Sequence, residues 1–498
     1  MIIHFLKMRL LIACLASFLC LLTSQSSLYA QERDLTLDVM GVGPFSVGST
    51  NFTTIAITPG VDAGQYQQGL NQGGNLLYIN ALLAFEDASF SFQLSVPDDS
   101  VRYGASAGTT LPYSAYVLYP TTEENTRADY EVFIPPALPH MQGQNESPIF
   151  ADDAQQYPLV VYSHGVGSHP TAERLSFLKD LASHGYIVLA LYHGDNRFGQ
   201  TEARQFNLRP LAVKAAIDKI LVDPDFGDHI DATRIGGVGE SFGGATMMAL
   251  LGARKVNPDF LSVASNALHT ATIDSRIVAA SSIVPYAGKA PYAFFGVGGT
   301  GAGSIDRPFM ANSANADSET DFTMVEAAVN AIPGVKYLVE YDGEDHAMSE
   351  GAVTDAYTWT KLFLDAFVKK DAVAIDELSR VKSVNGSGSD SLSIVTDPEP
   401  VTDTNASTAA FANNILSVPA IAVLDKYYSL DLNYIADSNP VQFGLSSVTE
   451  IASQSATSGS FANGVLVLPV VDVAGTNYRI ELTLVSESPA LFNLTFAE

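Results

Sequence analysis

Cysteine is almost absent from the sequence. The 498 residues include two, Cys14 and Cys20, and both lie in an N-terminal segment that we expect to be removed. The remaining chain would then have no disulfide bond, no thiol nucleophile and no thiolate metal site. The nine histidines are scattered without an H-E-x-x-H pattern, and Asp223, Asp225 and Asp228 lack the glycine and glutamate of an EF-hand loop. We therefore expect neither a metal nor a cofactor.

Basic residues are also few. The chain has 26 Lys and Arg against 54 Asp and Glu, a net charge of −28, which disfavours nucleic acid and other polyanions as partners. Long apolar runs are missing as well, apart from the N-terminus. We therefore expect a soluble protein without a stable membrane span.

The first thirty residues have the features of a signal peptide, 1–30. Lys7 and Arg9 precede the apolar run Leu10–Leu22, which is shorter than the roughly 20 residues of a membrane-spanning helix, and a small residue stands at Ala30. We expect cleavage after Ala30 and export to the periplasm or the cell exterior. Lipoprotein anchoring at Cys14 is the weaker interpretation, because only a short apolar stretch precedes it.

Residues 31–382 are predicted to form one large domain in which apolar runs alternate with amphipathic stretches. This alternation indicates strands joined by helices, and hence a mainly parallel sheet with right-handed crossovers. Its strand-rich start, within 41–136, is expected to supply antiparallel edge strands, and 64–107 is interpreted as a possible insertion. The expected strands are 46–58, 113–119, 158–162, 186–192, 235–239, 308–311 and 335–341, and the expected helices are 173–184, 209–221, 241–253 and 352–369.

A segment rich in Ser, Asp, Thr, Gly and Pro, 383–409, is predicted to link this domain to a β-rich domain, 410–498. There, Phe-Ala-Asn at 411–413 and the apolar positions that follow recur 50 residues later. Because apolar residues alternate within each copy, we predict an all-β domain of two repeats, 410–445 and 460–494, that pack on each other.

Gly239-Glu240-Ser241-Phe242-Gly243 lies between a predicted strand and a predicted helix. In that context G-x-S-x-G predicts a sharp turn that presents the serine hydroxyl, with flanking glycines that let the chain turn. A serine nucleophile needs a base to remove its proton and an acid to orient that base, in the chain order Ser, Asp or Glu, His. We interpret Ser241 as the candidate nucleophile.

Two histidines follow Ser241 in the sequence. His346 comes directly after a predicted strand, where the base is expected, whereas His269 lies in a polar stretch. The acid is expected in the loop after the preceding strand. Asp317 is the first candidate there, and the alternatives that stay open are Asp306, Glu319 and Asp321.

The oxyanion that forms when a serine attacks an ester needs preorganised N–H donors. One is expected from the backbone of Phe242, the residue after the nucleophile. The other is expected from the loop Ser163-His164-Gly165-Val166-Gly167, in which Val166 is best placed. His164 is interpreted as support for this loop, because it precedes the serine.

Three stretches together resemble the bacterial relatives of platelet-activating-factor acetylhydrolase: Tyr157–Gly167, Leu181–Val188 and Gly239–Thr246. The wider group includes dienelactone-hydrolase-like proteins and cutinase-like polyester hydrolases. The resemblance covers about 43–370. It implies an α/β-hydrolase fold, a three-layer sandwich, with the nucleophile, the base and the oxyanion donors in the roles given above.

Two departures from the acetylhydrolases bear on the substrate. Glu240 precedes the nucleophile where they usually have His, and 277–286, where they place the acid, contains no carboxylate. An acid after the next strand, as at Asp317, resembles the polyester hydrolases instead. Dienelactone hydrolases proper use a cysteine nucleophile, so Ser241 argues against that activity.

We therefore expect a secreted serine esterase that hydrolyses carboxylic esters through an acyl-enzyme, with a small-molecule or polymeric ester as substrate. The acyl groups are expected to be short or medium, or part of a polyester. Two alternatives stay open: a surface or secreted binding protein with an inert hydrolase domain, and an acyltransferase in which an alcohol replaces water. The sequence does not decide between polymer and small ester, the role of the repeats, or the oligomeric state.

Overall fold

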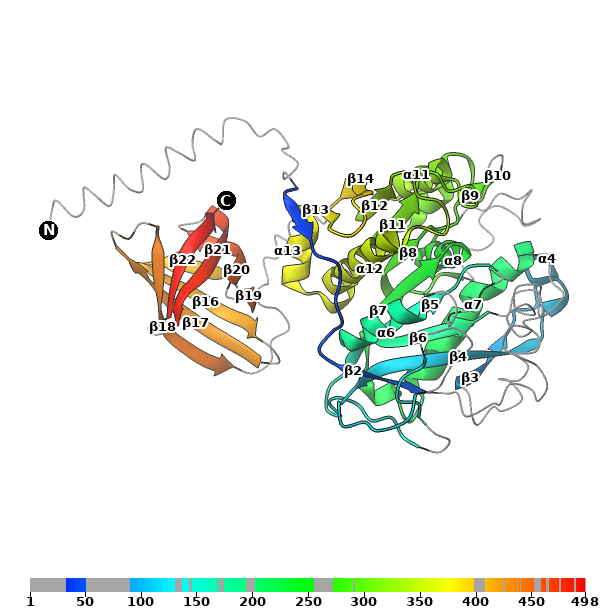
Figure 1. Cartoon of the computed structure of the whole chain (residues 1–498), viewed down its shortest axis with the longest axis horizontal. Coiled ribbons are helices and arrows are strands. Elements are labelled where there is room, and N and C mark those ends of the chain that lie inside the picture. Colours follow the sequence, from blue (N-terminus) through cyan, green and yellow to red (C-terminus); the bar gives the residue numbers. More distant parts are fainter. Residues whose placement is uncertain are drawn as a thin grey trace.

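The structure, a computed structural model, forms two large sheets, one of ten strands and one of eight, and two short two-stranded sheets among the residues that it describes. Figure 1 shows that the ten-stranded sheet and its helices precede the eight-stranded sheet along the chain. The predicted signal peptide lies outside the described residues. These are 33–50, 90–129, 137–142, 146–166, 168, 170, 174–193, 202–254, 272–289, 292–397, 408–423, 426–436, 438, 440–451, 458–462, 465–473, 476–487 and 490–497.

The large sheet is mainly parallel. Its strands are β2 (Ser46–Thr50), β3 (Phe90–Ser95), β4 (Thr110–Thr121), β5 (Tyr157–Ser163), β6 (Ile187–Tyr192), β7 (Ile230–Glu240), β8 (Ile277–Ile283), β11 (Phe309–Ala314), β12 (Lys336–Tyr341) and β14 (Asp390–Thr396). The order is β14-β12-β11-β8-β7-β5-β6-β4-β2, with β3 paired to β4. From β12 to β6 all neighbours are parallel, whereas β14, β4, β2 and β3 pair antiparallel. This confirms the predicted parallel sheet with antiparallel edge strands.

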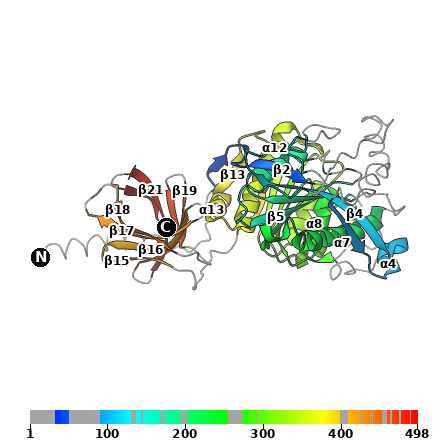
Figure 2. The ribbon, with the colours of Figure 1, turned by 90° about the horizontal axis from the view of Figure 1, so that it is seen from below.

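Helices cover both faces of this sheet (Figure 2). They are α4 (Ser100–Tyr103), α6 (Leu175–Ser183), α7 (Glu202–Leu221), α8 (Phe242–Leu251), α11 (Phe322–Ala331), α12 (Glu350–Leu364) and α13 (Ala372–Arg380). On β5, Leu159 and Val161 belong to the core that includes α7, α8 and α11, and Val160 and Tyr162 to the core that includes α6 and α12. Because successive side chains of a strand point to opposite faces, a strand between two helical layers is apolar on both faces. None of the described helices combines the length and apolar character of a membrane-spanning one.

The structure differs from the predicted linker and adds a strand within the possible insertion. β14 falls in the predicted linker 383–409, yet it forms the edge of the large sheet, so the domain extends at least to Asp397. β3 falls in the possible insertion 64–107, yet it pairs with β4; residues 64–89 of that insertion lie outside the described residues. Edge strands carry polar side chains on their exposed face, and in sequence they therefore resemble loops.

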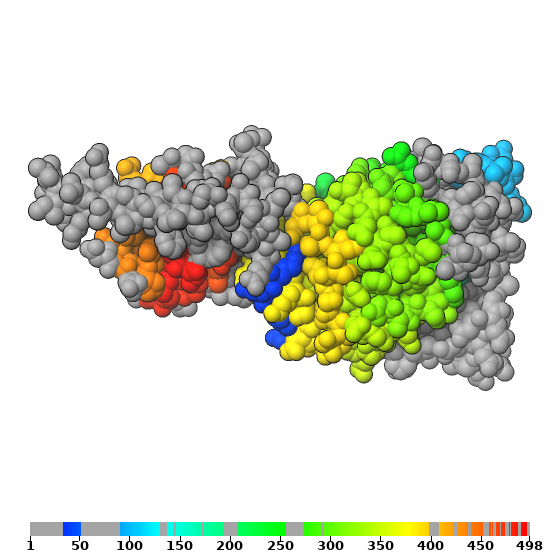
Figure 3. Space-filling model, turned by 90° about the horizontal axis from the view of Figure 1, so that it is seen from above, coloured from blue at the N-terminus to red at the C-terminus, as the bar shows by residue number. Residues whose placement is uncertain are grey.

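The N-terminal segment closes against the end of this domain. β1 (Leu35–Leu37) pairs in parallel with β13 (Val381–Val384). Arg33 donates hydrogen bonds to the carbonyls of Leu378 and Val381 and pairs with Asp397 at 2.7 Å. Figure 3 shows this blue segment on the surface against the yellow one. The remaining short elements are η2 (Gly104–Ser106), η3 (Gly227–His229), β9 (Gly288–Lys289), β10 (Tyr292–Ala293), η4 (Val297–Ser304) and η5 (Asp365–Lys369).

The C-terminal part is a β domain with its own core. Its strands are β15 (Ala409–Ala412), β16 (Ile415–Val423), β17 (Lys426–Ile435), β18 (Gln442–Ile451), β19 (Gly459–Ala462), β20 (Val465–Val473), β21 (Thr476–Glu487) and β22 (Ala490–Ala497). Their order is β15-β16-β17-β18-β22-β21-β20-β19, and the pairs β15–β20 and β16–β19 join the two ends of the sheet. The sheet therefore surrounds one apolar core, which includes Leu416, Leu432, Leu466 and Leu482.

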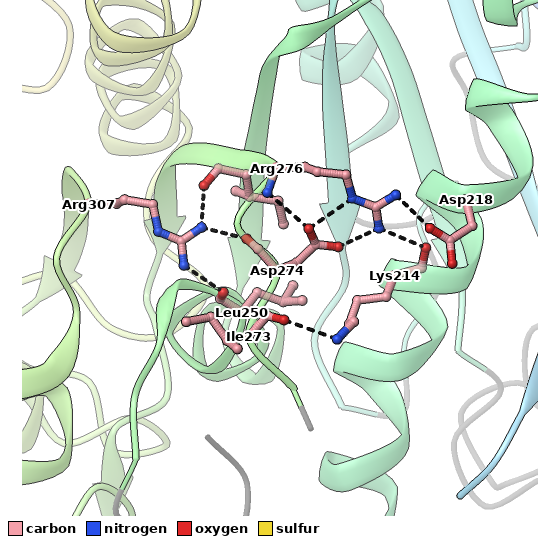
Figure 4. A network of polar contacts seen from close by, with 8 residues as sticks. Lys214, Asp218, Leu250, Ile273, Asp274, Arg276 and Arg307 are labelled. Carbon is pink, nitrogen blue, oxygen red and sulfur yellow. Dashed lines mark hydrogen bonds and ion pairs between the residues drawn. The ribbon is translucent and has the colours of Figure 1, made fainter. Parts of the chain in front are cut away.

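A polar network holds the C-terminal end of α8 (Figure 4). Arg307, just before β11, donates hydrogen bonds to the carbonyls of Leu250, Asp274 and Ile277. Burial raises the pKa of the Asp274 carboxylate, but hydrogen bonds from Arg276 outweigh this effect and hold the pKa below its ordinary value. The network therefore ties α8, β8 and β11 together at the amino edge of the sheet.

We predict that Arg307→Met lowers the free energy of unfolding by about 2 kcal/mol, because three carbonyls lose a charged donor. Urea unfolding followed by circular dichroism measures the change. The control is Arg254→Met at an exposed arginine, which should cost less than about 0.5 kcal/mol. Equal effects of the two substitutions would show that the network does not stabilise the fold.

Candidate active site

Ser241 stands in a strained turn between β7 and α8. Its backbone has φ 49° and ψ −114°, in the positive-φ region that residues other than glycine rarely adopt. The N–H of Ser241 donates to the carbonyl of Ile283, and its carbonyl accepts from the N–H of Tyr286. Ile283 is the last residue of β8 and Tyr286 lies three residues beyond it, so the end of the neighbouring strand and the loop after it hold the turn in this conformation while Ser241 remains half-buried.

Two glycines of this turn are required by packing. A Cβ at Gly239 would lie 2.3 Å from the carbonyl oxygen of Gly243, and a Cβ at Gly243 would lie 1.8 Å from the carbonyl oxygen of Ser163. Neither glycine has a positive φ. The glycines therefore allow α8 to lie directly against β7 and β5, while Ser241 itself adopts the unusual conformation.

His346 and Asp317 form a hydrogen-bonded pair. Asp317 follows β11 and His346 follows β12, and 2.7 Å separates Nδ1 of His346 from Oδ2 of Asp317. Oδ1 of Asp317 accepts from the backbone N–H groups of Glu319 (2.7 Å) and Thr320 (2.9 Å). Oδ2 also accepts from the hydroxyl of Thr320 at 2.5 Å. Both carboxylate oxygens are thus held, on a side chain with no exposed surface.

The other candidate acids have different surroundings. Asp306 pairs with the neighbouring arginine at 3.4 Å, and Asp321 is the N-cap of α11. Glu319 has 65% of its side chain exposed. Among the four acids left open by the sequence, the structure brings Asp317 into a hydrogen bond with the histidine. The other candidate base, His269, lies outside the described residues.

The contact shifts the pKa values of both partners. Burial lowers the pKa of His346, but the hydrogen bond and charge of Asp317, and then the charge of Glu240, outweigh burial and raise it above 6.5. Burial raises the pKa of Asp317, but hydrogen bonds from His346 and Thr320 outweigh it and lower this pKa below 3.8. Asp317 is therefore ionised at neutral pH and stabilises the protonated form of His346.

Ser241, Asp317 and His346 lie at one edge of the sheet. They follow β7, β11 and β12, which run parallel within one sheet, and the carboxyl ends of parallel strands share an edge. The charge of Glu240, next to Ser241, acts on His346. Within the described ranges, no group of three His, Cys, Asp or Glu side chains is arranged to hold a metal ion.

The two predicted oxyanion donors follow β5 and β7, which pair directly. Val166 lies in the loop after β5, and Phe242 is the first residue of α8. His164, in the same loop, is fully buried. Its Nδ1 lies 2.7 Å from the carbonyl oxygen of Gly165, and its Nε2 accepts from the N–H of His193 at 3.1 Å. These contacts agree with the interpretation of His164 as a support for the loop.

Glu240 forms an ion pair that the sequence did not predict. Nε and Nη2 of Arg174 lie 2.5 and 2.6 Å from its two carboxylate oxygens, and the hydroxyl of Tyr162 lies 3.3 Å from one of them. The side chains of Arg174 and Glu240 are 12% and 10% exposed. Glu240 was singled out in the sequence as a departure from a family pattern, but Arg174, 66 positions earlier, carries no local signal.

A comparison with protein families agrees with the resemblance predicted from the motifs. The model of the family platelet-activating factor acetylhydrolase, isoform II, matches residues 140–210. This segment includes β5, the loop with His164 and Val166, α6 and β6. No curated protein matches the chain. The match confirms the resemblance to α/β-hydrolases of the acetylhydrolase type and supports a hydrolase that acts on esters.

We predict that Glu240→Gln lowers the free energy of unfolding by about 3 kcal/mol, because Arg174 becomes an unpaired charge with little access to solvent. The double variant Arg174→Met/Glu240→Gln should recover part of this loss, since it removes both charges. Urea unfolding of the parent, both single variants and the double variant gives the coupling free energy between the two side chains. Additive effects would contradict a stabilising ion pair.

Proposed function

We propose that the protein is an exported serine esterase in which Ser241 is the nucleophile, His346 the general base and Asp317 the residue that orients the base. The observation that carries this proposal is the 2.7 Å hydrogen bond between His346 and Asp317, at the sheet edge where a strained turn presents Ser241. In α/β-hydrolases, a strained nucleophile turn, a histidine and a buried carboxylate together carry out acyl transfer by serine.

In this mechanism, His346 Nε2 takes the proton of Ser241 as Oγ forms a bond to the carbonyl carbon of the ester. The carbonyl oxygen becomes an oxyanion that accepts hydrogen bonds from the N–H groups of Val166 and Phe242. When the C–O bond breaks, the alcohol leaves with the proton from His346, and Ser241 carries the acyl group. Water then gives a proton to His346 as its oxygen bonds to the acyl carbon. The bond between that carbon and Ser241 Oγ breaks, His346 returns the proton to Oγ, and the carboxylic acid leaves.

We propose short or medium acyl esters, or polyesters, as substrates. β8 ends at Ile283, and the residues after it, Val284-Pro285-Tyr286, contain no carboxylate. Asp317 instead follows β11, the next strand of the sheet. An acid in this place resembles the polyester hydrolases more than the acetylhydrolases.

Export and a two-copy β domain also belong to this proposal. The basic and apolar pattern of 1–30 supports export. In the β domain, β15, β16 and β17 begin at 409, 415 and 426, and β19, β20 and β21 begin at 459, 465 and 476, an offset of 50 residues in each case. The equal offset supports two copies of one β unit.

We predict that the protein without 1–30 releases p-nitrophenol from p-nitrophenyl acetate and butyrate. Ser241→Ala should lower kcat/KM by about 10⁴-fold or more, and Asp317→Asn by about 10³-fold, because they remove the nucleophile and the group that orients the base. Ser383→Ala, in β13, is the matched control and should retain full activity. Activity that survives Ser241→Ala would overturn the proposal and favour a binding role for the chain.

We predict that kcat/KM of the parent protein falls as the pH drops below an apparent pKa above 6.5, because a protonated His346 cannot accept the proton of Ser241. In Asp317→Asn, the acid limb should move to lower pH, since the hydrogen bond and the charge that raise the pKa of His346 are lost. Rates measured from pH 5 to about 9 in buffers of constant ionic strength test this. An acid limb that stays in place after Asp317→Asn would exclude Asp317 as the partner of the titrating base.

A further inference from the structure

Arg209, in α7, lies beneath the loop that follows β5. Its side chain is buried, with 1% of the residue exposed. Nη1 donates a hydrogen bond to the carbonyl oxygen of His164 at 2.5 Å, and Nη2 donates to the carbonyl oxygen of Gly165 at 3.1 Å. A single guanidinium therefore holds two consecutive carbonyls of the loop that contains Val166.

The direction of the Gly165 carbonyl sets the direction of the Val166 N–H. The two groups belong to one peptide unit, and in a planar trans peptide they point in opposite directions. The oxygen of Gly165 is held twice, by Arg209 and by Nδ1 of His164 at 2.7 Å. Nε2 of His164 accepts from the backbone N–H of His193, so the proton of the neutral ring is on Nδ1. Both groups at this oxygen are therefore donors, and they fix the plane from which the Val166 N–H projects.

The same guanidinium also contacts the second oxyanion residue. Its carbon Cζ lies 4.9 Å from the centre of the Phe242 ring, within the range of a cation–π contact. Phe242 is the first residue of α8, and the ring is almost fully buried. Arg209 thus contacts the backbone of one segment and the side chain of the other, and these two segments contain the N–H groups that are assigned to the oxyanion.

We propose that Arg209 is a positioning residue for the oxyanion hole: it holds the Gly165 peptide and the Phe242 side chain so that the N–H groups of Val166 and Phe242 point at the oxyanion. This inference rests on the proposed esterase function. Arginine suits the role because its planar fork reaches two carbonyls at once, whereas the ammonium of lysine is a single point donor. The contribution of Arg209 therefore appears in the transition state more than in substrate binding.

Arg209→Met and Arg209→Lys test the proposal, with Arg307→Met as the matched control. Arg307 also donates to backbone carbonyls, but it lies at the opposite, amino edge of the sheet (Figure 4). For p-nitrophenyl butyrate, kcat of Arg209→Met should fall about 30-fold while KM changes by less than about threefold, because a misdirected donor costs less than the 10²–10³-fold of a deleted one. The kcat of Arg209→Lys should lie between that of the parent protein and that of Arg209→Met. Arg307→Met should lose stability and keep its kcat.

A second measurement separates positioning from folding. An alkyl trifluoromethyl ketone adds to a serine Oγ and forms a tetrahedral oxyanion that uses the same donors as the reaction. Its inhibition constant should rise in Arg209→Met by the factor by which kcat/KM falls, at a temperature well below the Tm of each variant. In Arg307→Met, the inhibition constant should not change.

The outcomes distinguish this inference from the proposed function. If the parent protein has no Ser241-dependent esterase activity, the proposed function fails. If that activity is present but Arg209→Met changes only KM or only Tm, or if neither Arg209 variant folds, Arg209 is a structural residue and the inference is overturned. The inference is supported if Arg209→Met loses kcat and ketone affinity in parallel and Arg209→Lys restores part of both.

Discussion

The contact between Gly243 and the carbonyl of Ser163 is the constraint on which the rest of the site depends. It brings the first turn of α8 against the end of β5, so closely that a Cβ at Gly243 would lie 1.8 Å from that oxygen. The turn at Ser241 and the loop with Val166 therefore both lie next to this contact. Because a backbone-to-backbone approach has no rotamer freedom, the spacing between Ser241, the proposed nucleophile, and the proposed oxyanion loop is fixed by the fold itself.

The sheet also keeps charges in pairs within a strongly acidic chain. Asp317 lies where three N–H or O–H donors and His346 compensate for burial, and Glu240 lies against Arg174. Both carboxylates act on His346 in the same direction and raise its pKa. A base that receives a proton during the reaction is stabilised by such fixed charges, because they require no rearrangement when the proton arrives.

The sequence predicted those parts of the site that local patterns encode. Ser241 and His346 follow strands that the sequence predicted, 235–239 and 335–341, and the turn chemistry is contained in five consecutive residues. Among the four candidate acids, the structure distinguishes Asp317 by its hydrogen bond to His346, a contact that sequence spacing could not define. Arg174 and Arg209 were missed, since each acts on residues 33 or more positions away. β14 was missed because its burial alternates and its polar side chains gave it the composition of a linker.

The loops that carry Asp317 and His346, the proposed acid and base, are joined to each other before any substrate binds. Asn315, between β11 and Asp317, accepts a hydrogen bond from the N–H of Gly343 and donates to Asp342, both in the loop that leads to His346. The N–H of Asp342 in turn donates to the carbonyl of Ser389, next to the edge strand β14. The strand β14, which falls in the predicted linker, therefore supports the loop that leads to His346. Because this loop is held from both sides, the fold itself positions His346. Substrate binding therefore need not supply the free energy of ordering it.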